Sequence, residues 1–504
     1  MAPSPAYPVV DLLVIGGGIN GAGIARDAAG RGLSVLLCEQ GDPAGATSSA
    51  SSKLIHGGLR YLEHADFRLV RESLREREIL LRIAPHLSRP LRFILPHAPQ
   101  LRPAWLIRLG LALYDRLEGS PSLPASETVD LSRPPWSAWL KPEYRKGFIY
   151  SDVQTDDARL VVLNLRDAVE HGATVCDRTR VRAARREGAL WCVTLEDSES
   201  GKPHEVRARA LVNAAGPWVG ALRERLAHDP RPVGLRLIKG SHIVVPRIEP
   251  GEHAFTLQQP DGRVVFLLPF EREFTLIGTT EIDHPDPEQK PQPSTAEIDY
   301  LCAAANRTLR VPLKAADVVW SFAGLRALFD DGKHDPAAIT RDYHLELDGR
   351  HSEAPLLSIF GGKLTTYRAL AETVMNRLAP WLPTPAPAWT ARAPLPGGDR
   401  PFGEVVAELR TRHPHLDPVW LEQLARRHGS RATRLLAGVE QPGDLGEDFG
   451  GGLFECEVRH FIAHEWAREA DDILWRRSKA GLHMTAAQRL AFARWLVDKR
   501  SPDG

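Results

Sequence analysis

The amino-acid sequence predicts an α/β protein in three parts, and three observations support this fold class. Residues 9–39 have the pattern of a strand, a helix and a second strand. Residues 233–330 alternate short apolar runs with turn signals, which is typical of an antiparallel sheet. Residues 401–500 show mainly helical periodicity and predict a separate α-helical domain. With 504 residues the chain is too long for one core, so two or three domains are expected.

The first part contains a glycine-rich turn between its first strand and its helix. An apolar run ends at Gly16, and Gly18 and Gly21 complete the pattern G-x-G-x-x-G; Glu39 ends the next apolar run about 20 residues later. Gly16 permits a tight turn, Gly18 lets the backbone approach a pyrophosphate, and Gly21 lets helix and strand pack closely. The helix N-terminus would face the phosphates, and Glu39 would accept hydrogen bonds from ribose hydroxyls. The pattern predicts a Rossmann-like dinucleotide-binding unit but does not separate NAD from FAD.

The composition excludes several classes of protein. The formal net charge is 0, so no global attraction to nucleic acid is expected. Five cysteines are scattered without a C-x-x-C pair, which argues for a reducing compartment and against a disulfide or zinc framework, and no metal site is predicted. The first eight residues lack the basic start and apolar core of a signal peptide. No uncharged apolar run approaches the ~18–20 residues that span a bilayer, so a transmembrane protein is not expected.

Residues 53–116 carry a local excess of positive charge, with twelve Lys or Arg against six Asp or Glu. Within them, residues 67–83 predict a charged amphipathic helix that ends near Pro85. A second helix, over residues 104–117, would be apolar on nearly every side. Such a helix either packs in a core or lies in a membrane interface. Its basic flanks and Trp105 favour the membrane.

The remaining segments are assigned to domains in chain order. A Pro- and Ser-rich loop over residues 118–147 leaves the first domain, and a helix over residues 156–171 returns to it. A later strand ends in small residues at Gly216, which allows close approach to the dinucleotide. The proline-rich residues 381–400 are predicted as a linker. The predicted domains are residues 7–88 with 145–225 and 335–380, residues 89–144 with 226–334, and residues 401–504.

Segments spread over nearly the whole chain resemble one known family. They are Ser48 to Tyr61, with small hydroxyl residues and a Gly-Gly pair; Lys239 to Pro246; Ala323 to Arg326; Ile339 to Asp342 with Gly361 to Tyr367; and Glu465 to Ala467 with Asp472 to Arg477. Together they resemble the FAD-dependent glycerol-3-phosphate dehydrogenases of the membrane-associated respiratory type. The resemblance implies a Rossmann-like FAD-binding domain, an antiparallel-sheet substrate domain and a C-terminal α-helical domain.

The glycine pattern and the resemblance together predict which residues contact FAD. His56 is expected to pack on the isoalloxazine ring rather than to transfer protons. The full set of predicted FAD contacts is Gly16, Gly18, Gly21, Glu39, Thr47, Ser48, Ser52, Lys53, Leu54, His56, Gly216, Gly361, Gly362, Lys363, Leu364 and Thr365.

Oxidation of a secondary alcohol on a flavin needs hydride transfer, removal of the hydroxyl proton and neutralisation of charge on the flavin pyrimidine. Lys363 and the helix start after it would stabilise a reduced anionic flavin. Arginine forks suit a phosphorylated substrate, and the resemblance implies that its ligands are Arg60, Tyr61, Arg326 and Arg341. His242 is the candidate base, because histidine titrates near neutral pH. Arg326 is an alternative group for polarising the substrate oxygen, which would leave the base unassigned. The predicted catalytic residues are His242, Arg326 and Lys363.

The resemblance implies oxidation of sn-glycerol 3-phosphate to dihydroxyacetone phosphate, with electrons passed to a membrane quinone. It also implies a cytoplasmic enzyme bound peripherally to the inner face of the cell membrane, and it leaves a homodimer open. The first alternative is an oxidase that converts O2 to H2O2, and a more distant one is an enzyme for a different amine or hydroxy acid. A non-catalytic FAD-dependent scaffold or redox sensor is a third. Lys363, Arg326 and Arg341 argue against a sensor, which needs no phosphate clamp.

Overall fold

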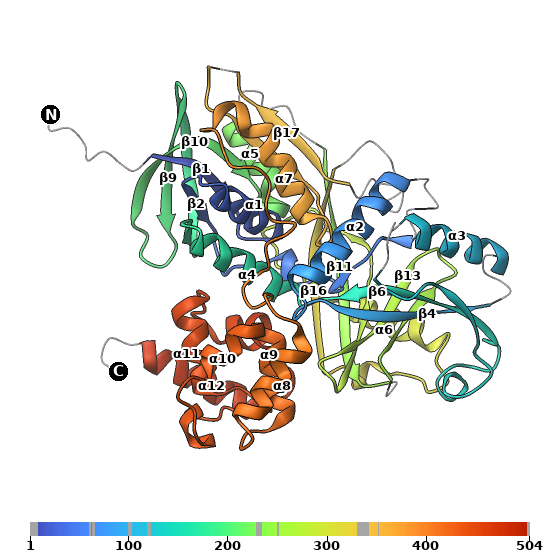
Figure 1. Cartoon of the computed structure of the whole chain (residues 1–504). Helices are drawn as coiled ribbons and strands as arrows, with labels where there is room; N and C mark the ends of the chain where they lie inside the picture. Colours follow the sequence, from blue (N-terminus) through green and yellow to red (C-terminus); the bar gives the residue numbers. More distant parts are fainter. Residues whose placement is uncertain are drawn as a thin grey trace, which may run out of the picture.

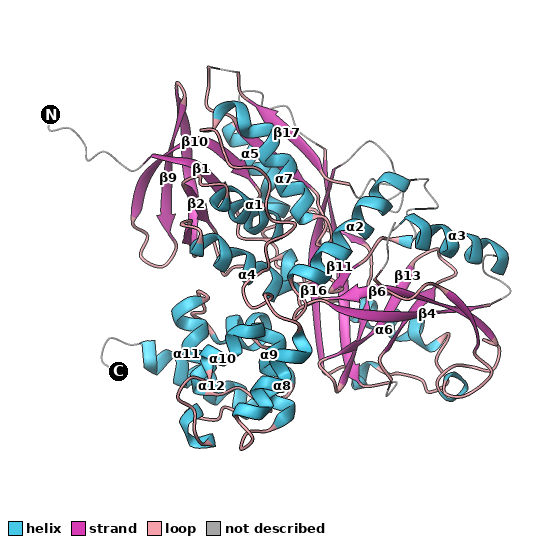
Figure 2. Ribbon diagram, in the orientation of Figure 1, coloured by secondary structure: helices cyan, strands magenta, loops and turns pink. Residues whose placement is uncertain are grey.

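The computed structural model describes residues 9–59, 62, 66–98, 103–117, 122–227, 234–248, 251–329, 342–350 and 352–500. These residues form two sheet-containing domains side by side and a group of helices, orange to red in Figure 1, below the first domain. Figure 2 shows helices and loops in this third part and strands in the other two. The predicted α/β fold with a separate C-terminal helical domain is confirmed.

The first domain is built on an eight-stranded sheet in the order β17-β18-β10-β1-β2-β7, with β9 beside β10 and β8 beside β9. The centre is parallel, and its strands are buried on both faces, which accounts for their continuous apolar sequences. The parallel strands are β1 (Val9–Ile15), β2 (Val35–Cys38), β7 (Thr174–Cys176), β10 (Pro203–Asn213) and β18 (Leu356–Phe360). The antiparallel strands are β8 (Thr179–Glu187), β9 (Leu190–Asp197) and β17 (His344–Asp348).

Helices and a strand meander cover the two faces of this sheet. One face packs against α1 (Ile19–Gly30), α4 (Asp157–Glu170) and α7 (Tyr367–Leu378), and the other against α5 (Val219–Leu226) and the β8–β9 meander. The alanine-rich sequence of α1 places it close to both α4 and α7 (Figure 1). The carboxylate of Asp156 accepts a hydrogen bond from the Arg159 backbone N–H and begins α4. The β1-α1-β2 order confirms the predicted Rossmann-like unit.

The second domain is built on a ten-stranded, mostly antiparallel sheet in the order β15-β11-β14-β13-β12-β4-β6-β3, with β16 beside β11 and β5 beside β6. Helix α6 (Thr295–Asn306) covers one face, and α3 (Ala104–Leu117) packs on the other. The strands are β3 (Leu54–Ile55), β4 (Arg89–His97), β5 (Glu127–Asp130), β6 (Lys146–Gln154), β11 (Leu235–Pro246), β12 (His253–Gln258), β13 (Val264–Phe270), β14 (Phe274–Gly278), β15 (Ile282–Asp283) and β16 (Trp320–Phe329).

The domain boundary differs from the prediction at β3 and β6. The sequence predicts residues 54–55 and 146–154 in the first domain, but β6 pairs with β4 along its whole length and with β3 at its end. Backbone pairing with β4, which no local sequence pattern reveals, determines this placement. Residues 9–39 and 356–360, by contrast, lie in the first domain as predicted.

Helices α2 (Phe67–Ile83) and α3 (Ala104–Leu117) have the bounds that the sequence predicts. One face of α3 is buried on the second sheet through Ile107 and Leu111. Its other face exposes 69% of Trp105, 42% of Leu106 and 59% of Leu109. The helix therefore packs in a core on one face and exposes an apolar surface on the other, and the membrane contact that its sequence favours stays a prediction. Within the described ranges, no helix is long and apolar enough to cross a bilayer.

The C-terminal domain has two small apolar cores. Its helices are α8 (Phe402–Arg412), α9 (Pro418–His428), α10 (Ala432–Leu435), α11 (Glu455–His464), a π-helix (Asp472–Arg477) and α12 (Ala486–Arg500). Residues 381–400, the predicted linker, pack along the first domain: Leu382 and Leu395 enter its core, and the Trp389 indole N–H donates to the Asp27 carbonyl at 3.1 Å.

Candidate active site and cofactor-binding site

The glycine-rich turn after β1 leaves no space for side chains at two of its glycines. A Cβ atom at Gly16, whose φ is +110°, would lie 2.5 Å from the Ala214 carbonyl oxygen. A Cβ atom at Gly21 would lie 1.9 Å from the Gly16 carbonyl oxygen. Gly18 is the N-cap of α1 and offers no capping side chain. The turn therefore presents backbone N–H groups at a helix N-terminus, which is a site for phosphate.

Glu39 lies beside this turn at the end of β2. Its carboxylate accepts hydrogen bonds from the backbone N–H groups of Gly17 at 2.6 Å and Gly41 at 2.8 Å. Burial raises the pKa of this carboxyl, and the two N–H donors oppose the rise. A carboxylate has about four acceptor positions, so the two held by the backbone leave capacity for ribose hydroxyls.

The segment after Glu39 connects the turn to the second sheet. The Ser48 hydroxyl accepts a hydrogen bond from the Ile19 N–H at 3.0 Å, and the Thr47 hydroxyl donates to the Leu325 carbonyl at 2.6 Å. These two bonds hold the segment between α1 and β16. The contact of Thr47 and Ser48 with the cofactor stays a prediction.

Lys53 and Leu54 differ from the other predicted contacts. The Lys53 ammonium is buried and pairs with Asp157 at 2.7 Å, while the side chain of Leu54 is buried in the core under the second sheet. Their side chains are therefore committed to packing, and only their backbone is left to contact a cofactor. The buried Asp157 at the start of α4 requires this partner, because an unpaired buried carboxylate is costly.

A second glycine turn, between β18 and α7, lies against the N-terminus of α1. Gly361 and Gly362 have φ values of +79° and +101°, and the Asn20 side chain donates to the Gly361 carbonyl at 3.1 Å. The Thr365 hydroxyl accepts a hydrogen bond from the His56 backbone N–H at 3.3 Å. The turn thus brings its Lys363 and Leu364 and the 47–56 segment to the same edge of the first sheet. Gly216, with φ +56°, follows β10 at that edge.

His242 is buried between neighbouring strands of the second sheet. It pairs with Gly278 on β14 and Phe322 on β16; its ring stacks on Phe322 at 4.9 Å and 14°, and a Cβ atom at Gly278 would lie 2.0 Å from it. Its Nε2 atom is 2.9 Å from the Ser52 hydroxyl. Burial, and then the positive charges of Arg326 and Lys53, lower the pKa of His242 well below its usual value. The imidazole is therefore neutral at pH 7 and has a lone pair for a proton, and its lowered pKa makes it a weak base.

Arg326 lies on the same face of the sheet as His242. Its guanidinium contacts Glu281 at 3.4 Å and donates to the Thr279 hydroxyl at 3.2 Å, and its side chain is 28% exposed. A Cβ atom at Gly240 would lie 2.9 Å from the guanidinium. The cationic Arg326 and the neutral His242 therefore lie on one face of the sheet. This face contacts the 47–56 segment, because a Cβ atom at Gly324 would lie only 2.8 Å from Ala50.

Three predicted substrate ligands, Arg60, Tyr61 and Arg341, lie outside the described residues. Other contributors were missed by sequence reasoning: Asn20, Ser52 as the partner of His242, Phe322, and the small residues Gly240, Gly278 and Gly324. For most of them, the alternation of side chains along a strand was the signal in the sequence that could have revealed them. Gly240 and His242 on β11, and Phe322, Gly324 and Arg326 on β16, recur at every second position, which places each set on one face.

One group within the described ranges has metal-ligand geometry: the candidate ligand atoms of His428, His460 and Glu465 lie within 4.8 Å of one another. Arg159 contacts both carboxylate oxygens of Glu465 from a fully buried position. The charge that would attract a cation is thereby already balanced.

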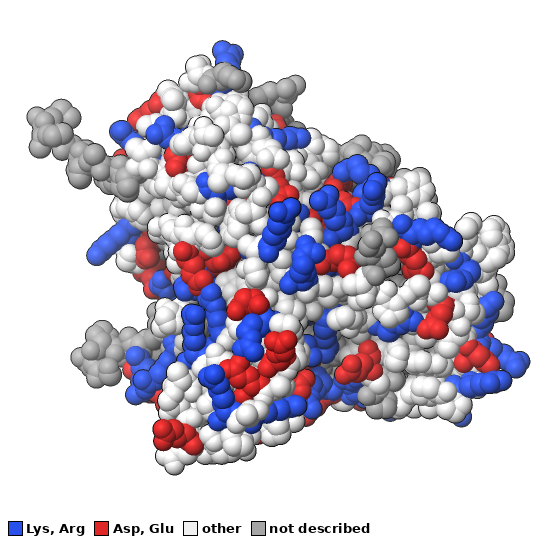
Figure 3. Space-filling view, viewed as in Figure 1, with Lys and Arg blue, Asp and Glu red and all other residues white. Residues whose placement is uncertain are grey.

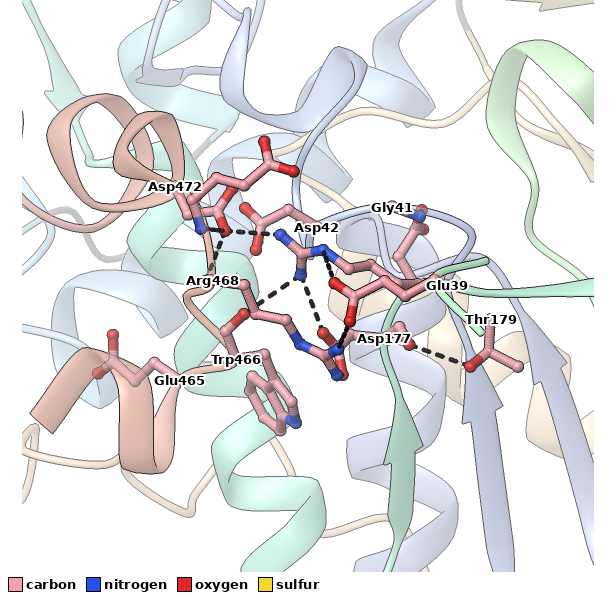
Figure 4. A network of polar contacts seen from close by, with 12 residues as sticks. Glu39, Gly41, Asp42, Asp177, Thr179, Glu465, Trp466, Arg468 and Asp472 are labelled. Carbon is pink, nitrogen blue, oxygen red and sulfur yellow. Dashed lines mark hydrogen bonds and ion pairs between the residues drawn. The ribbon is translucent and has the colours of Figure 1, made fainter. Parts of the chain in front are cut away.

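The C-terminal domain contacts the first domain next to Glu39. Figure 4 shows Arg468 and Asp472 meeting the loop that carries Asp177, with Glu39 and Asp42 close by. Arg468 pairs with Asp177 at 2.8 Å, Arg178 with Asp472 at 2.7 Å, and Arg477 is bidentate to Asp42 at 2.7 Å. Arginine–carboxylate hydrogen bonds are strong, and the bidentate pair also fixes orientation. They hold the π-helix against the loop that follows Glu39.

The two glycine turns, the uncapped start of α1 and the Glu39 carboxylate fit a dinucleotide that extends along this edge of the sheet. Residues 11–368 match the family model described as FAD dependent oxidoreductase, and residues 388–494 match the C-terminal domain of alpha-glycerophosphate oxidase. The chain is a member of the FAD-dependent oxidoreductases, and its cofactor is FAD.

Curated relatives and a solved structure narrow the family. The chain is 53% identical to a glycerol-3-phosphate dehydrogenase of Pseudomonas aeruginosa (98% of this chain, 96% of the relative) and 50% identical to the aerobic glycerol-3-phosphate dehydrogenase of Escherichia coli (97% of each). It is 49% identical to a D-erythritol 1-phosphate dehydrogenase of Brucella abortus (96% and 97%). The crystal structure of the Bacillus halodurans glycerol-3-phosphate dehydrogenase complexed with FAD has a TM-score of 0.76 at 29% identity, over 98% of this chain and 91% of that one. The chain belongs to the glycerol-3-phosphate dehydrogenase family of FAD-dependent enzymes.

Proposed function

We propose that this protein oxidises sn-glycerol 3-phosphate to dihydroxyacetone phosphate. The observation that carries the proposal is that the neutral, buried His242 and the cationic Arg326 lie on one face of the second sheet, beside the edge that binds FAD. FAD supplies the acceptor for the hydride that leaves the substrate carbon. The relatives named for this reaction support the substrate.

The residues divide the remaining tasks. His242 takes the hydroxyl proton in its neutral form. The Nε2–H group donates to the Ser52 hydroxyl and holds the ring in one orientation, and the lone pair that accepts the proton is then on Nδ1. Arg326 binds the anionic end of the substrate or its reacting oxygen through its guanidinium N–H groups. Lys363 and the start of α7 hold negative charge beside the second glycine turn.

Comparison of two polyol phosphates tests the substrate. The relative named for D-erythritol 1-phosphate is nearly as similar as those named for glycerol 3-phosphate, so both compounds are assayed with a dye as electron acceptor. The proposal expects a kcat/KM for glycerol 3-phosphate well above that for D-erythritol 1-phosphate, dihydroxyacetone phosphate as product, and little activity with unphosphorylated glycerol. The opposite order between the two phosphates would overturn the substrate.

We further propose that the electrons pass to a membrane quinone from an enzyme bound to the cytoplasmic face of the cell membrane. The exposed Trp105, Leu106 and Leu109 of α3 form an apolar surface, and in Figure 3 the area over α3 is largely uncharged with Lys and Arg beside it. An apolar helix face with basic neighbours suits the interface of an anionic membrane. Oxidase activity is the second candidate, because the C-terminal family model is that of alpha-glycerophosphate oxidase.

Vesicles containing ubiquinone test the acceptor and the membrane together. The protein is incubated with anionic vesicles, and quinone reduction and O2 consumption are followed in parallel. Rapid quinone reduction, weakened in the Leu106→Glu/Leu109→Glu variant while dye-linked activity is kept, supports the proposal. Fast O2 consumption with stoichiometric H2O2 would instead establish an oxidase.

A further inference from the structure

A line of stacked rings connects the C-terminal domain to His242. Trp475, in the π-helix, stacks on Trp320 with ring centroids 4.7 Å apart at 13°. Trp320 contacts Phe322 at 4.8 Å and 40°, and Phe322 stacks on His242 at 4.9 Å and 14°. These four residues are called the aromatic column below.

The sheet register holds the inner part of the column in place. Trp320 and Phe322 are two residues apart on β16, so they share a face, and Phe322 is the cross-strand partner of His242. The Lys53 ammonium lies 5.3 Å from the centre of the Phe322 ring and is itself fixed by Asp157. Phe322 therefore cannot shift without disturbing either the imidazole or a buried ion pair.

The outer end of the column depends on the docking of the C-terminal domain. On the C-terminal side of Trp475, Arg477 is bound to Asp42 at 2.7 Å and Lys479 is bound to Asp156 at 2.8 Å, and both basic side chains are almost fully buried. Leu482 packs on the same apolar core as Trp320 and Phe322. The indole of Trp475 is thus anchored to both domains that form the active site.

We propose that Trp475 is a positioning residue of the reaction, which holds the His242 imidazole in place through Trp320 and Phe322. Protein interiors transmit such contacts because they are close-packed. His242 has a glycine on its other strand neighbour, β14, so the column is what confines the ring on the Phe322 side. This inference rests on the proposed role of His242 and gives the C-terminal domain a part in catalysis without any contact with substrate.

The experiment is rapid anaerobic mixing of the FAD-loaded full-length protein with glycerol 3-phosphate, followed by flavin absorbance. The variants are Trp475→Ala, Trp475→Leu, which keeps apolar volume without a ring, and Trp475→Phe, which restores one. Trp495→Ala is the matched control, because Trp495 packs on the same C-terminal core as Trp475, but its ring contacts Phe449 and Phe492 and not a ring of the column. Each variant is also measured for FAD content and thermal stability.

The expected result separates positioning from stability. Trp475→Ala and Trp475→Leu slow flavin reduction at saturating substrate about 10- to 100-fold, the cost of misplacing a reacting group by ~1 Å, with FAD content kept. Trp475→Phe recovers most of the rate, and Trp495→Ala lowers only the melting temperature. In a His242→Ala background, Trp475→Ala has little further effect, because both changes remove the same function.

Failure of this inference and failure of the proposed function give different results. If the Trp475 variants lose stability but reduce their flavin at the wild-type rate, the column is packing alone and the inference is wrong. The inference is also wrong if Trp495→Ala slows reduction as much as Trp475→Ala. If glycerol 3-phosphate does not reduce the wild-type flavin at all, the proposed function fails, and the positioning role with it.

Discussion

Replacing Gly278 by alanine tests the placement of His242 without removing any functional group. The added Cβ atom would lie 2.0 Å from the imidazole, whereas carbon atoms in contact are about 3.5–4.0 Å apart. The ring must therefore move by about 1.5 Å or more, away from a strand partner that cannot retreat far within the sheet. Overpacking of this kind costs about 1–3 kcal/mol of stability, and a 1 Å error at a reacting group costs up to about 100-fold in rate.

The assay is the rate of flavin reduction by glycerol 3-phosphate under saturating conditions. Gly278→Ala is expected to lower this rate about 10- to 100-fold while FAD remains bound. Gly240→Ala is the paired variant, because its Cβ atom would meet Arg326, 2.9 Å away, and should mainly weaken substrate binding. Gly403→Ala, where a Cβ atom meets nothing within 4 Å, controls for the substitution itself. A normal reduction rate in folded Gly278→Ala would remove His242 from the proton transfer.

Three further predictions concern the clamp, the docking of the C-terminal domain and the dependence of stability on pH. Arg326→Ala should lower kcat/KM by about 10- to 100-fold with FAD retained, because a hydrogen bond to a charged group contributes about 1.5–3 kcal/mol. Unchanged steady-state kinetics would exclude Arg326 from the site. Arg477→Ala removes the bidentate partner of Asp42, and Asp42 keeps its contact with Arg476, so the free energy of unfolding should fall by about 3 kcal/mol in a denaturant titration. The variant should also retain less FAD after dialysis. Full FAD retention would contradict a role for the docked C-terminal domain at the loop that follows Glu39. Three buried histidines have pKa values lowered chiefly by burial, to about 3 and about 4 for two of them, so the unfolded chain binds protons that the folded chain does not, and stability should fall as pH drops below about 6.5. From pH 7 to 5.5 the loss is about 3–4 kcal/mol in urea unfolding, and a flat profile would refute the buried neutral state of the three residues, His86, His242 and His428.

The sequence was sufficient for the fold where patterns are local. The β1-α1-β2 unit and the bounds of α2 and α3 follow from periodicity and from glycine and proline signals. The misplaced β6 shows the limit, since a strand joins a sheet through a partner that its own sequence does not specify. The packed segment 381–400 shows the same limit, because its prolines predict a break in regular structure and not what Trp389 contacts.

The candidate site was predictable in its residue types and less so in its contacts. The glycine turns and Glu39 lie as their spacing requires, because a Cβ atom at Gly16 or Gly21 would collide with backbone. The side chain of Lys53 was not predictable, since only the fold brings Asp157, a hundred residues away, to pair with it. The aromatic column was equally invisible, because its rings come from three separate strands or helices.

Anaerobic addition of glycerol 3-phosphate to the purified yellow protein tests whether this compound reduces the flavin. We expect loss of the visible flavin absorbance in the wild type, a much slower loss in His242→Ala and Arg326→Ala, and rapid recovery of the colour when a quinone analogue is admitted. A flavin that keeps its absorbance at saturating glycerol 3-phosphate would contradict the substrate and the roles of both residues.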